Sequence, residues 1–193
     1  MIKSKKDYKE YLKEDGAGFT RSLKDILFND IRKFKKILRK LEYYSNCKNG
    51  YLNKLIIMYL RYQFMKKSRM LGFSIPINVF KPGLSIAHRG TIVVHPNAKV
   101  GANCRIHVCV VIGATGGSSK APIIGDNVYI GTGAKIIGDI KIADNIAIGA
   151  NSLVNKSFYE EGITIAGNPA KKISNKGSFK VGWNPKTKNI ISE

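Results

Sequence analysis

The chain has 193 residues, enough aliphatic side chains for a buried core, and a formal net charge of +20 from 33 Lys and Arg against 13 Asp and Glu. This length favours one core domain with a smaller appendage. No apolar run reaches the length of a membrane span, and the lysine-rich residues 1–13 lack the apolar centre of a secretory signal. Because Cys47, Cys104 and Cys109 have no metal-ligand spacing, we expect reduced thiols in a cytoplasmic protein.

The first part of the chain predicts helices. Residues 5–15 favour a short, highly charged helix that ends before Gly16-Ala17-Gly18. A second, amphipathic helix is expected from Ser22 onwards, because apolar residues recur at spacings of three and four: Leu23, Leu27, Ile31, Phe34, Leu38 and Leu41. A third helix, roughly residues 52–70, should carry its apolar residues on one side: Leu52, Leu55, Ile56, Tyr59 and Tyr62. We therefore expect a small α-helical region before the main domain.

This helical region carries most of the excess positive charge. Residues 1–72 contain 19 Lys and Arg against 7 Asp and Glu, a net charge of +12. Such charge is either a solvated surface or an attraction to a polyanion or an anionic membrane. The many aromatic side chains of the helices either pack on each other and on the main domain, or form a basic, aromatic face for peripheral contact with a membrane. Nucleic acid is not favoured, because no recognisable binding motif is present.

The rest of the chain is organised by a six-residue repeat. Large aliphatic residues occupy one phase of the repeat, with Ser118 as the exception: Val94, Val100, Ile106, Ile112, Ile124, Ile130, Ile136, Ile142, Ile148 and Val154. Neither a helical period nor plain alternation fits this spacing. The repeat predicts a parallel β-helix in which three hexapeptides form one coil, so that residues eighteen apart stack and each coil contacts only its neighbours.

These patterns divide the chain into an α-helical region (1–72), a β-helix domain (73–173) and a polar C-terminal tail (174–193). The repeat is interrupted from Gly113 to Ile123 by a glycine- and serine-rich stretch, which predicts a loop that projects from the domain. Loops on a rigid scaffold often carry function.

Two histidines stand out in the repeat. His88 and His107 are nineteen residues apart, one coil plus one residue, so we expect them near each other at the same corner of adjacent coils. A histidine with a near-neutral pKa can remove a proton from an attacking hydroxyl. The alternative is that His88 only hydrogen-bonds a loop. A two-histidine metal site is not favoured, because no well-placed carboxylate completes it.

Three sequence blocks resemble those of serine acetyltransferases within the hexapeptide acyltransferase superfamily. They are His88-Arg-Gly-Thr-Ile-Val-Val94, Gly131-Thr-Gly-Ala-Lys-Ile-Ile-Gly138 and Ala166-Gly-Asn-Pro-Ala170. The resemblance covers about residues 75–173. It implies an all-β, left-handed parallel β-helix that forms homotrimers, uses acetyl-CoA as co-substrate and employs His88 as general base.

Three positions depart from the family pattern. The family has an aspartate before the catalytic histidine where this chain has Ala87. The aspartate that orients the histidine falls on Phe73, and the family's second active-site histidine falls on Ala121. The departures indicate a different acceptor pocket.

The chain is also similar to short, basic acetyltransferases encoded with bacterial capsule genes, which carry a histidine at the position of His107. This similarity favours an O-acetyltransferase that acts on a sugar hydroxyl of a bacterial surface polysaccharide or its precursor. The alternatives are serine acetyltransferase and a non-catalytic binding or scaffold module.

The resemblance also implies a binding site for acetyl-CoA in the crevice between two subunits. The small residues Ala114, Thr132 and Ala150 would let the pantetheine arm approach the backbone, and Lys135 and Lys172 would hold its phosphates. His88 would take the acceptor proton, while His107 would orient His88 or bind the acceptor.

Overall fold

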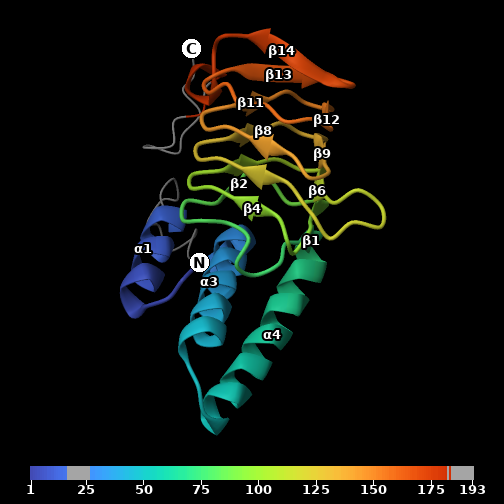
Figure 1. Ribbon diagram of the computed structural model, residues 1–193. Helices are drawn as coiled ribbons and strands as arrows, with labels where there is room; N and C mark the ends of the chain where they lie inside the picture. Colours follow the sequence, from blue (N-terminus) through green and yellow to red (C-terminus); the bar gives the residue numbers. More distant parts are fainter. Residues whose placement is uncertain (17–26, 182, 184–193) are drawn as a thin grey trace.

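The computed structural model describes residues 1–16, 27–181 and 183. A group of helices lies at one end of a three-sided prism of short strands (Figure 1). The helices are α1 (Lys5–Gly16), α3 (Asp30–Cys47) and α4 (Tyr51–Leu71), and a 3-10 turn, η1 (Ser178–Val181), follows the strands. The strands are β1 (Phe73–Ser74), β2 (Ser85–Ile86), β3 (Ile92–Val94), β4 (Lys99–Val100), β5 (Arg105–Ile106), β6 (Val110–Gly113), β7 (Ile123–Ile124), β8 (Tyr129–Ile130), β9 (Lys135–Ile137), β10 (Lys141–Ile142), β11 (Ala147–Ile148), β12 (Leu153–Val154), β13 (Thr164–Gly167) and β14 (Ala170–Ser174).

The strands form three sheets, one on each face of the prism. Their orders are β1-β3-β6-β9-β12, β10-β7-β4 and β14-β13-β11-β8-β5-β2. Neighbouring strands pair in parallel throughout, except for the antiparallel pair β13–β14 that ends the domain. Each coil of the chain therefore contributes a strand to each face in turn, and successive coils stack along the axis of the prism. The predicted fold class, a left-handed parallel β-helix after a small helical region, is confirmed.

The aliphatic residues of the repeat form the core of the prism. All ten are at most 3% exposed, from Val94 to Val154. Burial of such a side chain stabilises the fold by about 1.5 to 3 kcal/mol. The free thiol of Cys104 is also fully buried in this core.

The expected stacking of residues eighteen apart holds for some pairs of coils, including Ile92 beside Val110, and is wrong for others. Lys135 lies beside Leu153 at the predicted spacing, but Ser85 lies beside Arg105 and Lys99 beside Ile123. The last of these coils is longer because the stretch between β6 and β7 leaves the prism as the predicted loop, which projects to one side in Figure 1. The loop adds one hexapeptide to the coil without changing the six-residue spacing of the buried aliphatic residues.

Asparagines form one corner of the prism. Asn103, Asn127 and Asn145 have φ angles of 56°, 58° and 61°, a left-handed conformation that asparagine tolerates better than most residues. Their side chains form a ladder, because the Nδ2 of Asn103 donates to Asn127 at 3.1 Å and the Nδ2 of Asn127 donates to Asn145 at 2.9 Å. The same residues thus turn the chain and link successive coils.

The helices begin and end close to the predicted bounds, with one difference. α3 begins at Asp30 and not near Ser22, since the side chain of Asn29 accepts a hydrogen bond from the backbone N–H of Arg32 and caps the helix. Ser22 lies outside the described residues, and Leu27 is exposed. Along α3, Phe34 and Leu38 are buried as expected.

A buried ionic cluster joins the helices to the first coil. Arg39 on α3 is fully buried and pairs with Asp15 at 2.8 Å and with Glu42 at 2.9 Å. The same guanidinium donates to the backbone oxygens of Phe80 and Lys81. Burial alone lowers the pKa of Arg39, but the two carboxylates outweigh it and the net pKa is raised. The helices are therefore fixed rigidly on the base of the prism.

Among the described residues, no helix is both long enough and apolar enough to span a bilayer. The start of the C-terminal tail folds back on the prism, since Trp183 is fully buried and its Nε1 donates to the backbone oxygen of Asn103 at 3.3 Å. The prediction for residues 184–193 falls outside the described part of the chain.

Candidate active site

One edge of the prism collects the candidate residues. His88 lies between β2 and β3, and His107 lies between β5 and β6. Thr132 between β8 and β9 and Ala150 between β11 and β12 occupy the same edge on the next two coils. We call this set of four corner residues the histidine edge. It forms a line that runs over four successive coils.

The two histidines are close neighbours on this edge. The ring centroids of His88 and His107 are 6.2 Å apart, with an interplanar angle of 57°. The ring of Tyr129, on the outer side of β8, lies 5.1 Å from that of His107. His107 is thus placed between a second histidine and a phenol.

His107 is uncharged at neutral pH. Burial lowers its pKa to about 4, and the charges of Arg105 and His88 act in the same direction. Its Nε2 atom is buried and has no hydrogen-bond partner among the described residues. An uncharged imidazole with a free nitrogen can hydrogen-bond a ligand without competing for the proton that a general base accepts.

Arg105 brings a positive charge to the histidines. Its side chain is half-buried, Nη1 donates to the Oγ of Ser85 at 3.1 Å, and the guanidinium lies 5.1 Å from the ring centroid of Trp183. Its Nε is buried without a hydrogen-bond partner, and within the described parts of the chain no carboxylate forms an ion pair with it. Burial lowers the pKa of Arg105, although an arginine stays charged in proteins. This guanidinium is suited to an anionic ligand.

Sequence reasoning missed Arg105, Tyr129 and Trp183. Arg105 and Tyr129 each precede a buried residue of the six-residue repeat, and they are paired neighbours on β5 and β8. The residue before each buried repeat position faces outward, so this position in the repeat could have pointed to both side chains. Trp183 gave no signal, because it comes from the tail and reaches Arg105 only through the fold.

The three departures from the family pattern lie in different surroundings. Phe73 is buried and packs edge-to-face on Phe34, with ring centroids 5.1 Å apart, so it belongs to the contact between helices and prism. Ala121 is buried where the projecting loop rejoins β7, and Ala87 is half-buried beside His88.

The small residues proposed for the pantetheine arm divide into two groups. Thr132 and Ala150 are exposed and stack on adjacent coils, where the backbone N–H of Asn151 donates to the oxygen of Thr132 at 2.8 Å. Ala114 follows β6, at the far edge of the same prism face, where the projecting loop begins. The structure thus brings the first two together and leaves Ala114 apart.

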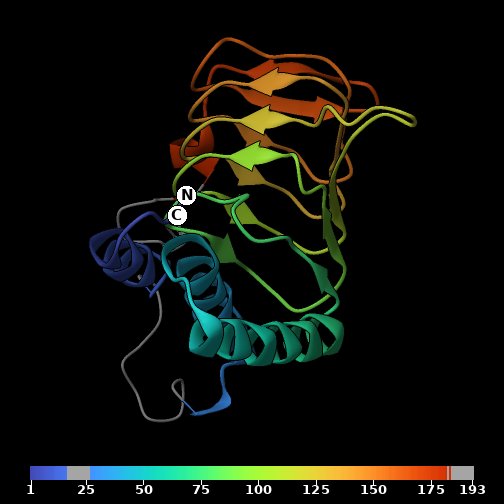
Figure 2. The ribbon, with the colours of Figure 1, turned by 60° about the horizontal axis from the view of Figure 1, so that its bottom comes forward.

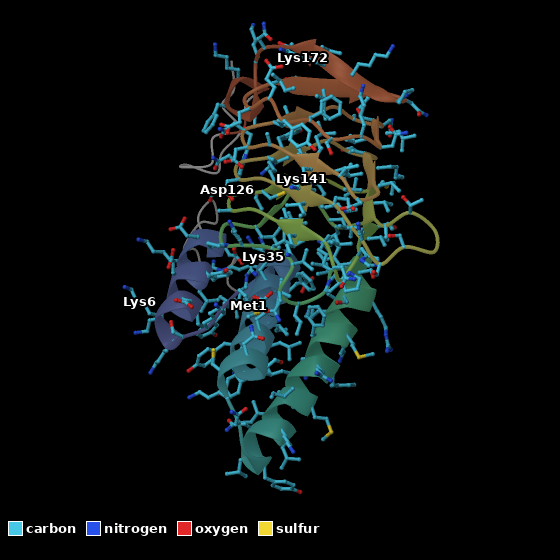
Figure 3. The ribbon with its side chains drawn as sticks, viewed as in Figure 1. Met1, Lys6, Lys35, Asp126, Lys141 and Lys172 are labelled. Atoms are coloured by element: carbon cyan, nitrogen blue, oxygen red, sulfur yellow. The ribbon has the colours of Figure 1, made fainter. Side chains whose placement is uncertain are left out.

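The two lysines proposed for the phosphates are also separated. Lys135 lies near the histidine edge, and its Nζ donates to the backbone oxygens of Cys109 at 2.7 Å and Gly133 at 2.8 Å. Lys172 lies on β14, at the end of the prism opposite the helices (Figure 3). It forms an ion pair with Glu160. The roles of both lysines remain predictions.

Within the described residues there is no group of three or more His, Cys, Asp or Glu side chains that could hold a metal ion.

The comparisons with known proteins agree on one group. The family model "Bacterial transferase hexapeptide (six repeats)" matches residues 121–156. A serine acetyltransferase of Synechococcus elongatus is 36% identical over 97 residues, which are 49% of this chain and 39% of that protein. A serine acetyltransferase of Staphylococcus aureus is 40% identical over 93 residues, 46% of this chain and 44% of that protein. The matched regions are therefore about two fifths of the length of these relatives.

Solved structures of the same group resemble nearly the whole chain. The crystal structure of serine acetyltransferase from Brucella abortus in complex with coenzyme A has a TM-score of 0.69 and 25% identity, and the match covers 89% of this chain and 68% of that one.

These similarities correct the predicted function. The main expectation, an O-acetyltransferase for the sugars of a surface polysaccharide, is wrong, because the relatives and structural neighbours are serine acetyltransferases. The prediction relied on the similarity to capsule-encoded acetyltransferases with a histidine at position 107, and on the missing polar groups at positions 73, 87 and 121. The absence of the family's polar groups at these positions does not by itself identify a different acceptor. Arg105 also supplies a charge near the histidines, which the prediction did not include.

Proposed function

We propose that this chain, a member of the hexapeptide-repeat acyltransferase superfamily, is an acetyl-CoA-dependent O-acetyltransferase whose acceptor is the hydroxyl of L-serine. The support for the acceptor comes from the names of the relatives and from one observation on this chain. That observation is the guanidinium of Arg105, which has no described carboxylate partner and lies on the strand that leads into His107.

A carboxylate-bearing acceptor suits this arrangement. A guanidinium presents a planar set of N–H donors that matches a carboxylate, and such charge-assisted hydrogen bonds are among the stronger ones. Trp183 packs on the guanidinium and Ser85 holds one of its nitrogens, so the side chain is partly preorganised. A neutral sugar would leave this half-buried charge without a partner.

In the proposed mechanism, His88 is the general base. Acetyl-CoA supplies an acetyl group activated as a thioester. His88 accepts the proton of the serine hydroxyl as the hydroxyl oxygen bonds to the acetyl carbon, and it returns this proton to the sulfur when the carbon–sulfur bond breaks. Backbone N–H groups stabilise the negative charge on the carbonyl oxygen.

His107 assists without carrying a charge. Because its pKa is lowered to about 4 by burial, Arg105 and His88, it does not take the proton at neutral pH. Its Nε2, which has no partner in the part of the chain that the structure describes, would instead hydrogen-bond the acceptor or orient His88.

Acetyl-CoA would lie along the histidine edge, with its thioester near His88. Thr132 and Ala150 leave this edge narrow and exposed, so an extended arm can approach the backbone. The sheet has five strand spacings from β2 to β14, which is roughly 24 Å.

Lys172 on β14 would therefore bind a phosphate of acetyl-CoA at the far end of the edge. Lys135 would bind a phosphate nearer the middle, after its Nζ leaves its carbonyl partners. The position of Ala114 at the other side of the face suits a contact with the arm from a neighbouring subunit.

A homotrimer would complete the site. Val93 and Ile123 are 39% and 40% exposed on two faces of the prism, and burial of such residues between subunits is favourable. The crevice between two prisms would then hold acetyl-CoA.

The experiment that tests the function is an assay of thiol release from acetyl-CoA with L-serine as acceptor. The wild-type chain should turn over L-serine, and Arg105→Gln should raise the KM for L-serine by about tenfold or more with a smaller change in kcat. Arg105→Lys should retain part of the affinity because it keeps the charge.

Arg61→Gln is the matched control, because Arg61 is an exposed arginine on α4 that is remote from the histidine edge. This variant should behave as wild type. Saturable CoA binding without turnover of L-serine would reject the proposed acceptor. Absence of CoA binding and of turnover would favour a binding or scaffold module instead.

A further inference from the structure

The outer side of α4 is an unusual surface. Large apolar residues recur along it at spacings of four and three, and each is at least 44% exposed: Tyr51, Leu55, Met58, Tyr62 and Met65. Next to this row lie Leu52, Tyr59 and Met70, which are 75%, 61% and 54% exposed. We call these eight residues the α4 outer face. Contiguous exposed apolar surface of this kind usually marks an interaction site.

The opposite side of α4 already has its packing partners. Leu60 and Leu71 are buried, and the ring of Phe64 stacks on Phe34 with centroids 5.4 Å apart. Lys67 pairs with Asp30 at 2.9 Å. The outer face is therefore not needed to hold α4 on the rest of the chain.

All charged side chains of α4 are positive. Its 21 residues include five cations and no acid: Lys54, Lys66, Lys67, Arg61 and Arg69. Only Lys67 has an ion-pair partner among the residues that the structure describes. On the helix, Lys54 and Arg61 flank one side of the apolar row, and Lys66 and Arg69 lie within it.

This charge argues against a second copy of the chain as the occupant. Two α4 helices that paired through their outer faces would bring Lys54 and Arg61 of both copies together without any acid from α4 to compensate. The net charge of +20 makes other surfaces of the chain poor partners as well. Charge complementarity requires an anionic partner.

The shape and composition favour a flat partner. α4 lies at the end of the molecule that is remote from β14 (Figure 1), and in Figure 2 it runs below the prism, beside α3. Tyrosine combines an apolar ring with a polar tip, which suits the boundary between headgroups and acyl chains, and leucine and methionine insert below it. Flanking lysine and arginine would contact the phosphates.

We infer that the α4 outer face binds the surface of an anionic phospholipid bilayer and holds the protein there as a peripheral protein. α4 lies parallel to the bilayer, its apolar row enters the interface, and its cations contact lipid phosphates. The binding does not depend on acetyl-CoA or on the acceptor.

Flotation with lipid vesicles tests this inference. The full chain should float with vesicles of equal parts phosphatidylcholine and phosphatidylglycerol, and it should stay unbound with phosphatidylcholine alone. Raised salt should weaken the binding, because exposed charges are screened.

The variant Lys54→Glu/Arg61→Glu should lose about tenfold or more in affinity for the anionic vesicles. The variant Leu55→Ser/Met58→Ser/Tyr62→Ser should also lose binding, since its apolar row is interrupted.

The matched control is Lys171→Glu/Lys176→Glu, which makes the same change in net charge at two exposed lysines on and just after β14, at the end of the prism remote from α4. It should float as the wild type does. Circular dichroism and light scattering on each variant report folding and assembly.

Three results would overturn the inference. They are no flotation of the folded wild-type chain, equal flotation with neutral vesicles, and equal losses in the α4 charge variant and its control. A lower mass in light scattering for the Leu55→Ser/Met58→Ser/Tyr62→Ser variant, without loss of vesicle binding, would show that the face is a contact between subunits. None of these readouts involves turnover, so failure of this inference is distinct from failure of the proposed acetyltransferase.

Discussion

At the residue scale, His88 and His107 are neighbours with different electrostatic surroundings. His107 lies beside the ring of Tyr129, and burial, together with the charges of Arg105 and His88, lowers its pKa and keeps it uncharged at neutral pH. His88 begins the sequence block that carries the resemblance. A neutral imidazole whose Nε2 has no partner among the described residues could bind the acceptor, while His88 transfers the proton.

Loss of each histidine should therefore cause a different defect. We expect His88→Ala to lower kcat by about 10² to 10⁴, because the general base is removed while other residues hold CoA. His107→Ala should have a smaller effect, mainly a higher KM for the acceptor. Steady-state kinetics together with calorimetry of CoA binding measures both. Near-normal turnover of His88→Ala with an inactive His107→Ala would reverse the two roles.

The lowered pKa of His107 also predicts a pH dependence of stability. An unfolded histidine titrates near pH 6.5, whereas His107 in the folded chain binds a proton only near pH 4. Between these values the unfolded state binds more protons, so the free energy of unfolding falls as the pH drops from 6.5 to 4. Urea unfolding at pH 7 and pH 5 should show a larger loss for wild type than for His107→Gln. Between pH 7 and pH 8 the two should change alike, and parallel losses down to pH 5 would contradict the assignment.

At the element scale, the helices depend on the ionic cluster that joins them to the first coil. Arg39 forms ion pairs with Asp15 and Glu42, and it donates two hydrogen bonds to the backbone oxygens of Phe80 and Lys81 at the base of the prism. Asp15 in turn accepts from the backbone N–H groups of residues 83 and 84. Removal of one member therefore leaves other buried charges unpaired.

We expect Arg39→Ala to lower the free energy of unfolding by about 3 to 5 kcal/mol, because two carboxylates remain buried without their partner. Lys40→Ala is the control on the same helix, since Lys40 is exposed, and it should change stability by about 0.5 kcal/mol or less. Urea unfolding at fixed protein concentration measures both. Equal effects of the two substitutions would mean that the cluster does not hold the helices.

At the scale of the whole molecule, the prism exposes apolar side chains on its flat faces, with Val93 and Ile123 as examples. The proposed acetyl-CoA site lies along an edge that one subunit leaves open. We expect a homotrimer, with a mass about three times that of the 21.4 kDa chain, by light scattering in solution. Ile123→Glu should lower this mass because it places a charge on a flat face. A wild-type monomer at micromolar concentration would contradict both the assembly and the shared site.

Much of the fold was predictable from the sequence because its main signal is periodic. From Val94 to Val154 the repeat places a buried aliphatic residue at nearly every sixth position. A chain with this spacing can bury all of these side chains in one core only if it coils around a common axis. The lengths of individual coils were less predictable. Ser85 pairs with Arg105 and Lys99 with Ile123, since loops can lengthen a coil without changing the phase of the repeat.

The sequence by itself determined the prism, its core and the pair of histidines, because these depend on local spacing along the chain. The tertiary structure decided which side of α4 is free and which charge lies near the histidines. Leu60 is buried while Tyr59 is exposed, and Trp183 contacts Arg105 across the fold. Both results depend on contacts between segments far apart in sequence, and no period in the sequence encodes such contacts.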